Sequence, residues 1–396
     1  MTPAGPLDSA PTRESLRIPV HRPFFGREEA EAVARIMEDR WVGKGAVTTA
    51  FEHKVAEFLG VRELIAVDSG TAALHLALSS MELGPGDEVI VPALTFPSPV
   101  QAIFVLGARP VFCEVCEETL NLDVSDALER VTPKTRAIIP VHYGGVPCDM
   151  DELTGVARER NIVIVDDAAQ AFGSSYKGRK VGTLADLTCF SFDAIKNITC
   201  AGGGAIATDD EARARAIRPR RNLGIDMDSW ERFDQRRFWR YQVITEGLRY
   251  NLTNLHAAIG LVQLERLEEF KARKQAIVRR YDEALGSLEG IKLLVRDLRE
   301  VFPFSYVIRV LHGRRDDLIG YLRQRGIGST VQFIPNHLHP VFAEYRVPLP
   351  VTERLYDEIL TLPLYFEMSD ADVEEVISGI RSFLGGESVA RLSAQA

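Results

Sequence analysis

Residues 63–115 read ELIAVDSGTAALHLALSSMELGPGDEVIVPALTFPSPVQAIFVLGARPVFCEV. Short apolar runs rich in Val and Ile alternate in this stretch with longer segments that have helical spacing. The pattern predicts strands at 63–69, 87–93 and 109–115, with helices at 70–83 and 97–107 between them. Such alternation is typical of a mostly parallel sheet with helices on both faces, which places the chain in the α/β class.

The alternation continues toward the middle of the chain. Further strands are predicted at RAIIPVH (136–142), NIVIVDD (161–167), DLTCFSFD (186–193) and GGAIATDD (203–210), and MDELTGVARER (150–160) is helical. The predicted sheet therefore has seven strands. In an open sheet of this kind, binding and catalytic residues gather at the carboxyl ends of the strands.

The chain has 396 residues, and single cores stop growing at roughly 250–300 residues. After a long helical segment at 252–285 the pattern becomes mixed α and β. We therefore predict a loose leader at 1–17, a large domain at 18–270 and a smaller C-terminal α+β domain at 271–396.

Two helices carry specific expectations. The segment 28–39 (EEAEAVARIMED) has its apolar residues spaced so that one face holds Ala30, Val33, Ala34 and Met37. The C-terminal segment 369–384 begins with Ser369 and Asp372, the spacing of a capping box.

Composition limits the classes of function. Apolar residues make up 46% and charged residues 26%, and the net charge is −9, which argues against a nucleic-acid partner. The chain lacks a run of roughly 18–20 apolar residues and a signal-peptide core, so we expect no membrane partner and a cytoplasmic location. Cys113 and Cys116 have no second ligand pair, so no metal site is expected there.

The motif SGTAAL, which begins at Ser69, forms a short turn between a predicted strand and a predicted helix. The first backbone N–H groups of a helix are unpaired, and its dipole favours negative charge, so a phosphate fits there. Ser69 and Thr71 add hydroxyl groups. Taken alone, the motif fits a simple helix cap slightly better than a phosphate site.

Asp167 and Lys196 both follow predicted strands. Asp167 either holds a heterocyclic nitrogen in its protonated form or caps the helix that follows. Lys196, in FSFDAIKNITCAGGG, is either a lysine with a lowered pKa that bonds to a carbonyl group or an ordinary solvated side chain. The glycines at 202–204 allow another segment of backbone to approach closely.

The remaining histidines and basic runs do not point to one specific role. We interpret His142 and His256 as packing or hydrogen-bonding residues, and His337 and His339 lack a third metal ligand. The basic runs RARAIRPRRN (213–222) and RFDQRRFWR (232–240) are either solvated faces or part of a diphosphate site.

Taken together and in this order, the motifs resemble the DegT/DnrJ/EryC/StrS family of sugar-nucleotide aminotransferases, within the fold type I pyridoxal-phosphate enzymes. The resemblance extends from about residue 18 to about residue 384. Its most specific parts are SGTAALHLAL, GPGDEVIVPALTF, VDDAAQAFGSSYKGRKVG, CFSFDAIKNIT, YNLTNLHAAIGLVQL and LPLYFEMSDADVEEVI.

The resemblance implies a role for each matching residue. Lys196 would form a Schiff base with pyridoxal 5'-phosphate, and Asp167 would keep the ring nitrogen protonated. Phe96 would stack on the ring, and Gln170 would lie near the ring hydroxyl. The residues implied for the cofactor's phosphate are Gly70, Thr71, Ala72 and Ser191, with Arg249 or Asn251 reaching it from a neighbouring subunit of a homodimer. His337 and Trp239 are weaker candidates for substrate binding.

Three departures from the family pattern stand out. The chain has Ala201-Gly202-Gly203-Gly204 where many relatives have Gly-Glu-Gly-Gly. It has Arg249-Tyr250-Asn251 where many have Asn-Tyr-Arg, which leaves both Arg249 and Asn251 as candidates. Asp166-Asp167 replaces the usual Glu-Asp pair.

The resemblance implies transfer of an amino group from L-glutamate to a keto group of a nucleotide-diphosphate-linked deoxysugar, making an amino sugar for glycan or natural-product biosynthesis. One alternative is the same chemistry on a non-sugar cyclic ketone such as a cyclitol or an aminobenzoate precursor, and another is a non-catalytic regulator. A dinucleotide-binding dehydrogenase is not indicated, because CAGGGAIAT leads into a strand.

Overall fold

We describe a computed structural model of the chain, which covers residues 16–227, 230 and 239–386. Its centre is a seven-stranded sheet in the order β1-β9-β8-β5-β4-β2-β3. The strands are β1 (Glu63–Val67), β2 (Glu88–Pro92), β3 (Arg109–Cys113), β4 (Thr135–Ile138), β5 (Val163–Asp167), β8 (Leu187–Ser191) and β9 (Gly204–Thr208).

Six of these strands run in one direction, and β9 is antiparallel to both of its neighbours. Six of the seven strands fall within the stretches where the sequence predicts them, and β4 begins one residue before its predicted stretch. The prediction of an α/β fold with a mostly parallel seven-stranded sheet is confirmed.

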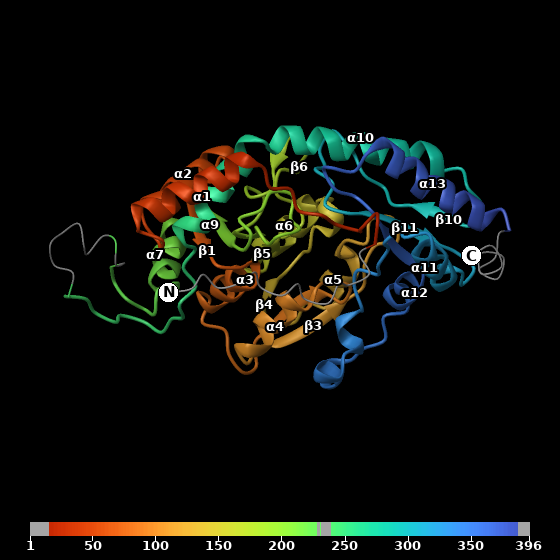
Figure 1. Ribbon diagram of the computed structural model, residues 1–396. Coiled ribbons are helices and arrows are strands. Elements are labelled where there is room, and N and C mark those ends of the chain that lie inside the picture. Colours follow the sequence, from red (N-terminus) through yellow and green to blue (C-terminus); the bar gives the residue numbers. More distant parts are fainter. Residues whose placement is uncertain (1–15, 228–229, 231–238, 387–396) are drawn as a thin grey trace.

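Helices cover both faces of this sheet (Figure 1). Strand residues alternate between the two layers: Leu64 and Ala66 of β1 pack into one core and Ile65 and Val67 into the other. The first core is closed by α2 (Ala46–Leu59), α5 (Val124–Glu129), α6 (Met150–Glu159) and α9 (Asn254–Glu265), and the second by α3 (Gly70–Ser79), α4 (Pro97–Val105) and α7 (Glu211–Arg220).

A second sheet lies in the C-terminal part, with three antiparallel strands in the order β10-β11-β12. Its elements are β10 (Ile291–Leu293), β11 (Tyr306–Val310), β12 (Ile359–Leu362), α10 (Leu267–Leu285), α11 (Arg315–Gln324), α12 (Pro350–Glu358) and α13 (Asp370–Leu384). The N-terminal Ile18 packs into this core, beside Ile327. The division at residue 270 stays a prediction, and most of the predicted leader lies outside the described residues.

The remaining elements connect these two parts. They are α1 (Arg27–Asp39), the short antiparallel pair β6 (Ser175–Tyr176) and β7 (Arg179–Lys180), and the 3₁₀ turns η1 (Tyr143–Gly145), η2 (Asn336–Leu338) and η3 (Pro340–Tyr345). The expected apolar face of α1 is wrong, because Ala32 and Ile36 are buried whereas Met37 is 59% exposed. The capping box at the start of α13 is confirmed, since Ser369 and Asp372 bond to each other's backbone N–H.

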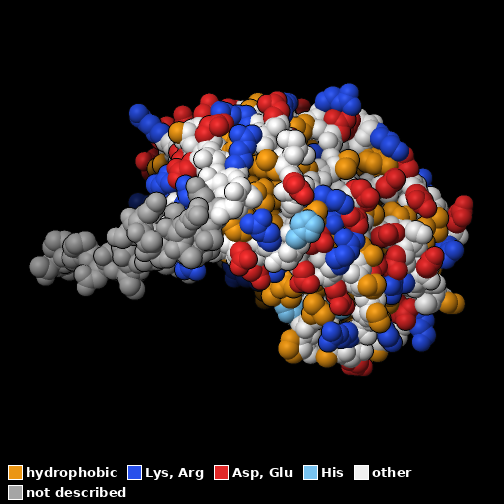
Figure 2. All heavy atoms as spheres, turned by 90° about the vertical axis from the view of Figure 1, so that its right-hand side faces the viewer, with side chains coloured by type: hydrophobic (Ala, Val, Ile, Leu, Met, Phe, Trp, Pro, Cys, Tyr) orange, Lys and Arg blue, Asp and Glu red, His pale blue; other side chains and the backbone are white. Residues whose placement is uncertain are grey.

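The outer surface carries charges of both signs. Figure 2 shows the face formed by the C-terminal elements, on which Lys and Arg side chains are interspersed with Asp and Glu. Among the described residues, no helix combines the length and the apolar character that crossing a membrane requires.

Candidate active site

A cavity of about 470 Å³ opens at the carboxyl ends of the parallel strands. Its walls come from the turns after β1, β2, β5 and β8 and from two C-terminal segments near residues 304 and 332. Seven residues predicted for the site line it: Gly70, Thr71, Phe96, Asp167, Gln170, Ser191 and Lys196. The fold therefore brings together residues that lie more than 120 positions apart in the sequence, at the edge where α/β folds bind ligands.

One end of the cavity is the N-terminus of α3. Ser69 caps this helix, its Oγ accepting the N–H of Ala72 at 3.1 Å, and Thr71 Oγ1 lies 2.7 Å from Ser98 Oγ. A Cβ on Gly70 would lie 2.9 Å from the Cβ of Ser191, so only glycine keeps this corner open. Ala72 itself is buried and takes part only through the cap. Hydroxyl groups around the positive end of a helix form a site for an anion such as phosphate.

Gly204 explains how this corner is built. A Cβ on Gly204 would lie 2.7 Å from the backbone nitrogen of Gly70. The turn between β1 and α3 therefore packs directly on the backbone of β9, and Gly202 and Gly203 line the cavity beside it. The glycine run predicted to allow close approach serves that purpose.

Asp167 ends β5 and is 5% exposed. Burial raises the pKa of its carboxyl group, while the N–H of Ala169, 3.0 Å from Oδ1, and the charge of Lys196 lower it. Its neighbour Asp166 points elsewhere, with Oδ2 lying 3.4 Å from Nε2 of the buried His142. Asp167 is thus the carboxylate that faces the cavity, and His142 is a buried hydrogen-bonding residue, whose Nδ1 accepts the N–H of Cys148 at 3.1 Å.

Lys196 lies in the loop after β8, where its backbone N–H donates to the carbonyl of Asp193 at 3.1 Å. Burial lowers the pKa of its amine, and the carboxylates of Asp167 and Asp193 act in the opposite direction. The amine also lies 4.6 Å from the centre of the Phe304 ring. A lysine with a lowered pKa is suited to proton transfer and to bonding with a carbonyl group.

Aromatic rings form the outer wall. Phe96 is 55% exposed, and its ring centre lies 5.6 Å from that of Phe333. Tyr143 donates its hydroxyl proton to the carbonyl of Gln332 and so ties this wall to the sheet. Gln170 accepts the N–H of Gly144 at 2.7 Å through Oε1, which leaves its amide NH₂ as the group it can offer a ligand.

The comparisons with known proteins agree with this geometry. The model of the DegT/DnrJ/EryC1/StrS aminotransferase family matches residues 23–381. The chain belongs to this family. It is an aminotransferase with the fold of the type I pyridoxal-phosphate enzymes.

Three relatives illustrate the similarity. SpsC of Bacillus subtilis (strain 168), a spore coat polysaccharide biosynthesis protein, is 38% identical over 379 residues, covering 93% of this chain and 97% of SpsC. The sugar aminotransferase CalS13 of Micromonospora echinospora has a TM-score of 0.86 and 29% identity, covering 92% and 99% of the two chains. The PLP form of Spr1654 of Streptococcus pneumoniae has a TM-score of 0.86 and 30% identity, covering 93% and 98%.

Besides Ala72, four of the predicted residues do not line the cavity of this aminotransferase. Asn251 pairs with Val67 through the backbone, and its Nδ2 donates to Asn222 Oδ1 at 2.8 Å. Arg249 and Trp239 are exposed on the segment 239–250, Trp239 to 69%. Several residues of the basic run 232–240 lie outside the described residues.

His337 also lies elsewhere in the aminotransferase. It is fully buried in η2, with Nε2 3.0 Å from Glu353 Oε1 and its ring near that of Phe112. This pairing accounts for its burial, so its role in substrate binding stays a prediction without support from the cavity. Within the described residues, His, Cys, Asp and Glu side chains form no group of three that would hold a metal ion.

No sequence pattern predicted the C-terminal contribution to the aminotransferase site. Phe304, Gln332 and Phe333 line the cavity, although FPFSYVIRVL indicates only a strand and residues 332–333 carry no motif. Lys274 was missed as well. No local pattern marks these residues, because only the packing of the second sheet against the first brings them to Lys196.

Proposed function

We propose that this aminotransferase transfers the amino group of L-glutamate to a keto group of a nucleotide-diphosphate-linked deoxysugar. The observation that carries the proposal is the joint placement of Lys196, Asp167 and the N-terminus of α3 around one cavity. Support for a sugar substrate comes from the relatives, because SpsC is named for polysaccharide biosynthesis and CalS13 for sugar amino transfer.

The cofactor is pyridoxal 5'-phosphate, and the residues of the cavity fit its separate groups. The capped N-terminus of α3, with Thr71 and Ser191, suits the phosphate, and the Gly70 corner would be closed by any side chain. The buried carboxylate of Asp167 suits a protonated ring nitrogen. Phe96 offers a ring face for stacking, and Gln170 an amide donor for the ring hydroxyl.

When bound, this cofactor supplies an electron sink and a reversible carrier for the amino group. Lys196 Nζ, as an uncharged amine, accepts the proton from the α-carbon of L-glutamate and later returns a proton to the product side. Burial favours that uncharged form. Burial raises the pKa of Asp167, and the Ala169 N–H and Lys196 oppose that shift by favouring the carboxylate, which would hold a proton on the ring nitrogen when the cofactor is bound.

The charge of the cavity supports a homodimer. Its described lining holds Asp68, Asp167 and Asp193 but only Lys196 as a cation. A phosphate cofactor and a diphosphate substrate need further donors, and we propose that a second copy of the chain supplies them, either as the positive charge of Arg249 or as the neutral amide of Asn251.

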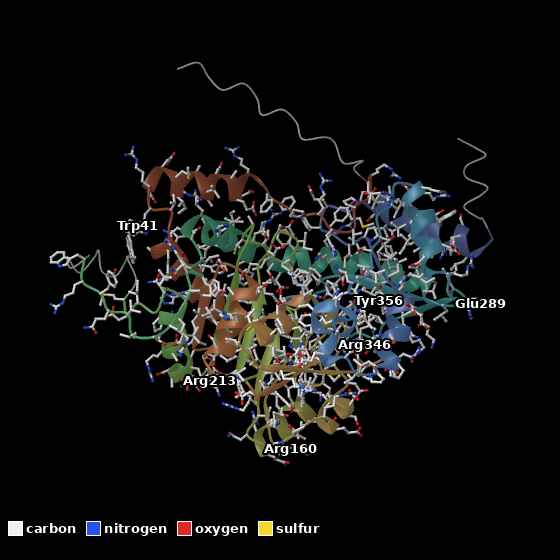
Figure 3. The ribbon with its side chains drawn as sticks, turned by 90° about the horizontal axis from the view of Figure 1, so that it is seen from below. Trp41, Arg160, Arg213, Glu289, Arg346 and Tyr356 are labelled. Carbon is white, nitrogen blue, oxygen red and sulfur yellow. The ribbon has the colours of Figure 1, made fainter. Side chains whose placement is uncertain are left out.

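The segment 239–250 supports the same proposal. It extends away from the rest of the molecule at the left of Figures 1 and 3, on the side where Trp41 packs against Trp230 with ring centres 5.0 Å apart. Its exposed apolar side chains are Trp239, Tyr241, Val243, Ile244 and Leu248. An apolar projection of this kind marks an interaction surface.

The five unpaired cysteines, four of them buried, support a cytoplasmic location.

The absorption spectrum of the purified protein tests the amino donor. We expect the visible band of lysine-bound pyridoxal phosphate to move to shorter wavelength when L-glutamate is added. A band that does not respond to L-glutamate contradicts the donor, and the absence of any band after reconstitution contradicts the whole proposal.

A panel of acceptors then tests the substrate. The amine-loaded protein should regain the visible band with a nucleotide-linked keto-deoxysugar and not with the free sugar. A faster return with a cyclitol ketone would replace the sugar proposal by the cyclic-ketone alternative.

A further inference from the structure

A second lysine is buried close to Lys196. Lys274, on α10, is 6% exposed, and burial lowers the pKa of its amine to about 7. Among the described residues no carboxylate lies within ion-pair distance of it. A buried amine without a carboxylate is costly, and an apolar side chain of the same length would fill the space at lower cost. The buried amine therefore makes the folded protein less stable than an apolar side chain would, which points to a role other than stability.

The hydrogen bond of Lys274 leads to the residue after Lys196. Its Nζ donates to Asn197 Oδ1 at 3.1 Å. Asn197 is 7% exposed, and its Nδ2 donates to the carbonyls of Phe302 at 3.1 Å and Phe172 at 3.4 Å. One amide thus joins the Lys196 loop to the segment after β5 and to the segment before β11.

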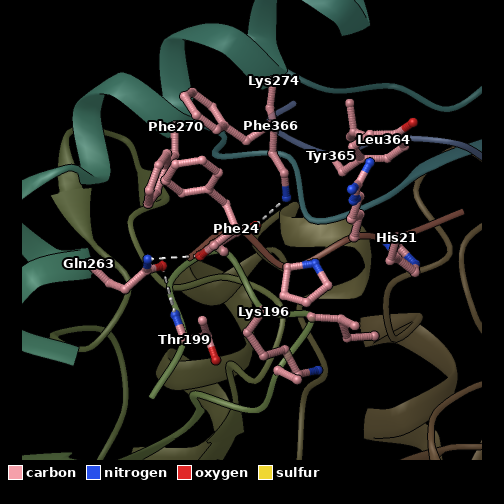
Figure 4. Close-up of a pocket in the computed structure, with 15 residues that line it drawn as sticks. His21, Phe24, Lys196, Thr199, Gln263, Phe270, Lys274, Leu364, Tyr365 and Phe366 are labelled. Atoms are coloured by element: carbon pink, nitrogen blue, oxygen red, sulfur yellow. Dashed lines mark hydrogen bonds between the residues drawn. The ribbon is translucent and has the colours of Figure 1, made fainter. Parts of the chain in front are cut away.

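Both lysines line a small pocket. Its volume is about 30 Å³, enough for one water molecule, and its walls include Lys196, Asn197, Lys274 and His21. Figure 4 shows the Lys274 side chain pointing from α10 toward His21 and Lys196. Lys196 therefore has the active-site cavity on one side and this small space on the other.

We propose that Lys274 is a positioning residue for Lys196, acting through the side-chain amide of Asn197. An ammonium or amine donor can face only the oxygen of the amide, so Lys274 fixes which way Asn197 points. That orientation aims Nδ2 at the two carbonyls and holds the backbone on the C-terminal side of Lys196. Lys196 must move its amine between reacting atoms. A rigid backbone at this residue lets the amine reach those atoms with the same geometry each time.

This inference rests on the proposed function, since it assigns a role in presenting Lys196 to pyridoxal phosphate. Three variants test it. Lys274→Met removes the donor and keeps the length, Lys274→Gln keeps a neutral donor, and Lys271→Met is the matched control. Lys271 lies on the same helix, but its Nζ donates to the carbonyl of Gly173 at 3.0 Å.

The readout is the rate at which apoprotein mixed with pyridoxal phosphate develops the visible band, with the bond to Lys196 verified by borohydride trapping and mass spectrometry. We expect Lys274→Met to slow this rate about 10-fold, Lys274→Gln to stay within about 3-fold of wild type, and Lys271→Met to match wild type. kcat should fall in parallel in Lys274→Met, with KM for the acceptor unchanged.

Asn197→Ala completes a double-mutant cycle. If Lys274 acts through Asn197, Lys274→Met slows the rate no further when Asn197 is already Ala. If Lys274→Met fails to fold, which its melting temperature reveals, Asn197→Ala keeps the test decisive, because it leaves Lys274 in place and should slow the rate about as much as Lys274→Met.

Equal rates for Lys274→Met and wild type overturn the inference, as do equally slow Lys274→Met and Lys274→Gln or additive effects in the cycle. A wild-type protein that forms no band overturns the proposed function itself, and with it this inference. That outcome is distinct, because it appears before any variant is compared.

Discussion

Asp167 and Lys196 line the same cavity, and the charge of each favours the ionised form of the other. Burial raises the pKa of Asp167 and lowers that of Lys196, and the attraction between the two groups opposes both shifts. For each group, therefore, burial favours the neutral form, and the attraction between the two groups favours the charged form. Such a balance is what a site needs when one group must stay anionic and the other must exchange a proton.

Lys196→Ala should lower turnover by more than about 1,000-fold, since it removes the amine that bonds the cofactor and moves the proton. The melting temperature should stay close to that of wild type, because Lys196 lies in a loop beside two cavities. Steady-state turnover with L-glutamate and calorimetry measure both quantities. Substantial multiple turnover by this variant would remove Lys196 from the mechanism.

Asp167→Asn should lower kcat about 100-fold, the scale of losing one preorganised electrostatic partner. The matched control is Asp193→Asn, because Asp193 lines the same cavity but is exposed. Equal losses in the two variants would show that general negative charge, rather than Asp167 itself, is what matters.

Gly70→Ala should weaken binding of pyridoxal phosphate about 10- to 100-fold, because the new Cβ would lie 2.9 Å from the Cβ of Ser191 and 3.3 Å from its Oγ. Equilibrium dialysis of the reconstituted protein measures the affinity. Gly155→Ala is the control, since a Cβ at Gly155 on α6 meets nothing within 4 Å. Unchanged affinity in Gly70→Ala would place the phosphate elsewhere.

Mixing Lys196→Ala with Asn251→Ala tests the composite site. In a homodimer whose sites take Asn251 from the neighbouring subunit, each mixed dimer regains one intact site, so roughly a quarter of wild-type activity should return. Arg249→Ala in place of Asn251→Ala decides between the two candidates. Light scattering that gives a monomer mass would contradict the dimer directly.

The buried amine of Lys274 should make stability depend on pH. Its pKa is about 7 in the folded protein and 10.5 when exposed, so between these values the unfolded chain binds the additional proton. Stability should therefore rise with pH in this window, by up to about 1.4 kcal/mol per pH unit, relative to Lys274→Met. Denaturation curves at pH 7 to 9.5 measure the difference, with Lys271→Met expected to keep the wild-type slope. Parallel curves for wild type and Lys274→Met would show that Lys274 is not buried as an amine.

Local sequence patterns predicted the helices and strands. They did not always predict which face of a helix is buried or where one helix ends and the next begins. In α1, periodicity predicted that Met37 lies on the buried face. The buried face instead includes Glu29, whose Oε1 accepts a hydrogen bond from Gln263 Nε2 on α9 at 2.6 Å. The predicted long helical segment is two helices, since α9 ends at Glu265 and α10 begins at Leu267. Both outcomes depend on contacts with distant segments, which periodicity within one window cannot contain.

The sequence by itself determined the strand–helix order, the sheet and the residues at its carboxyl edge, because hydrophobic spacing and turn residues act locally and strand direction then follows from connectivity. Only the tertiary structure decided that Phe304 and Phe333 wall the cavity, that His337 turns to Glu353, and that Lys274 bonds to Asn197. The two hydrogen bonds join residues 16 and 77 positions apart, and their energy depends on burial that exists only after the chain has folded.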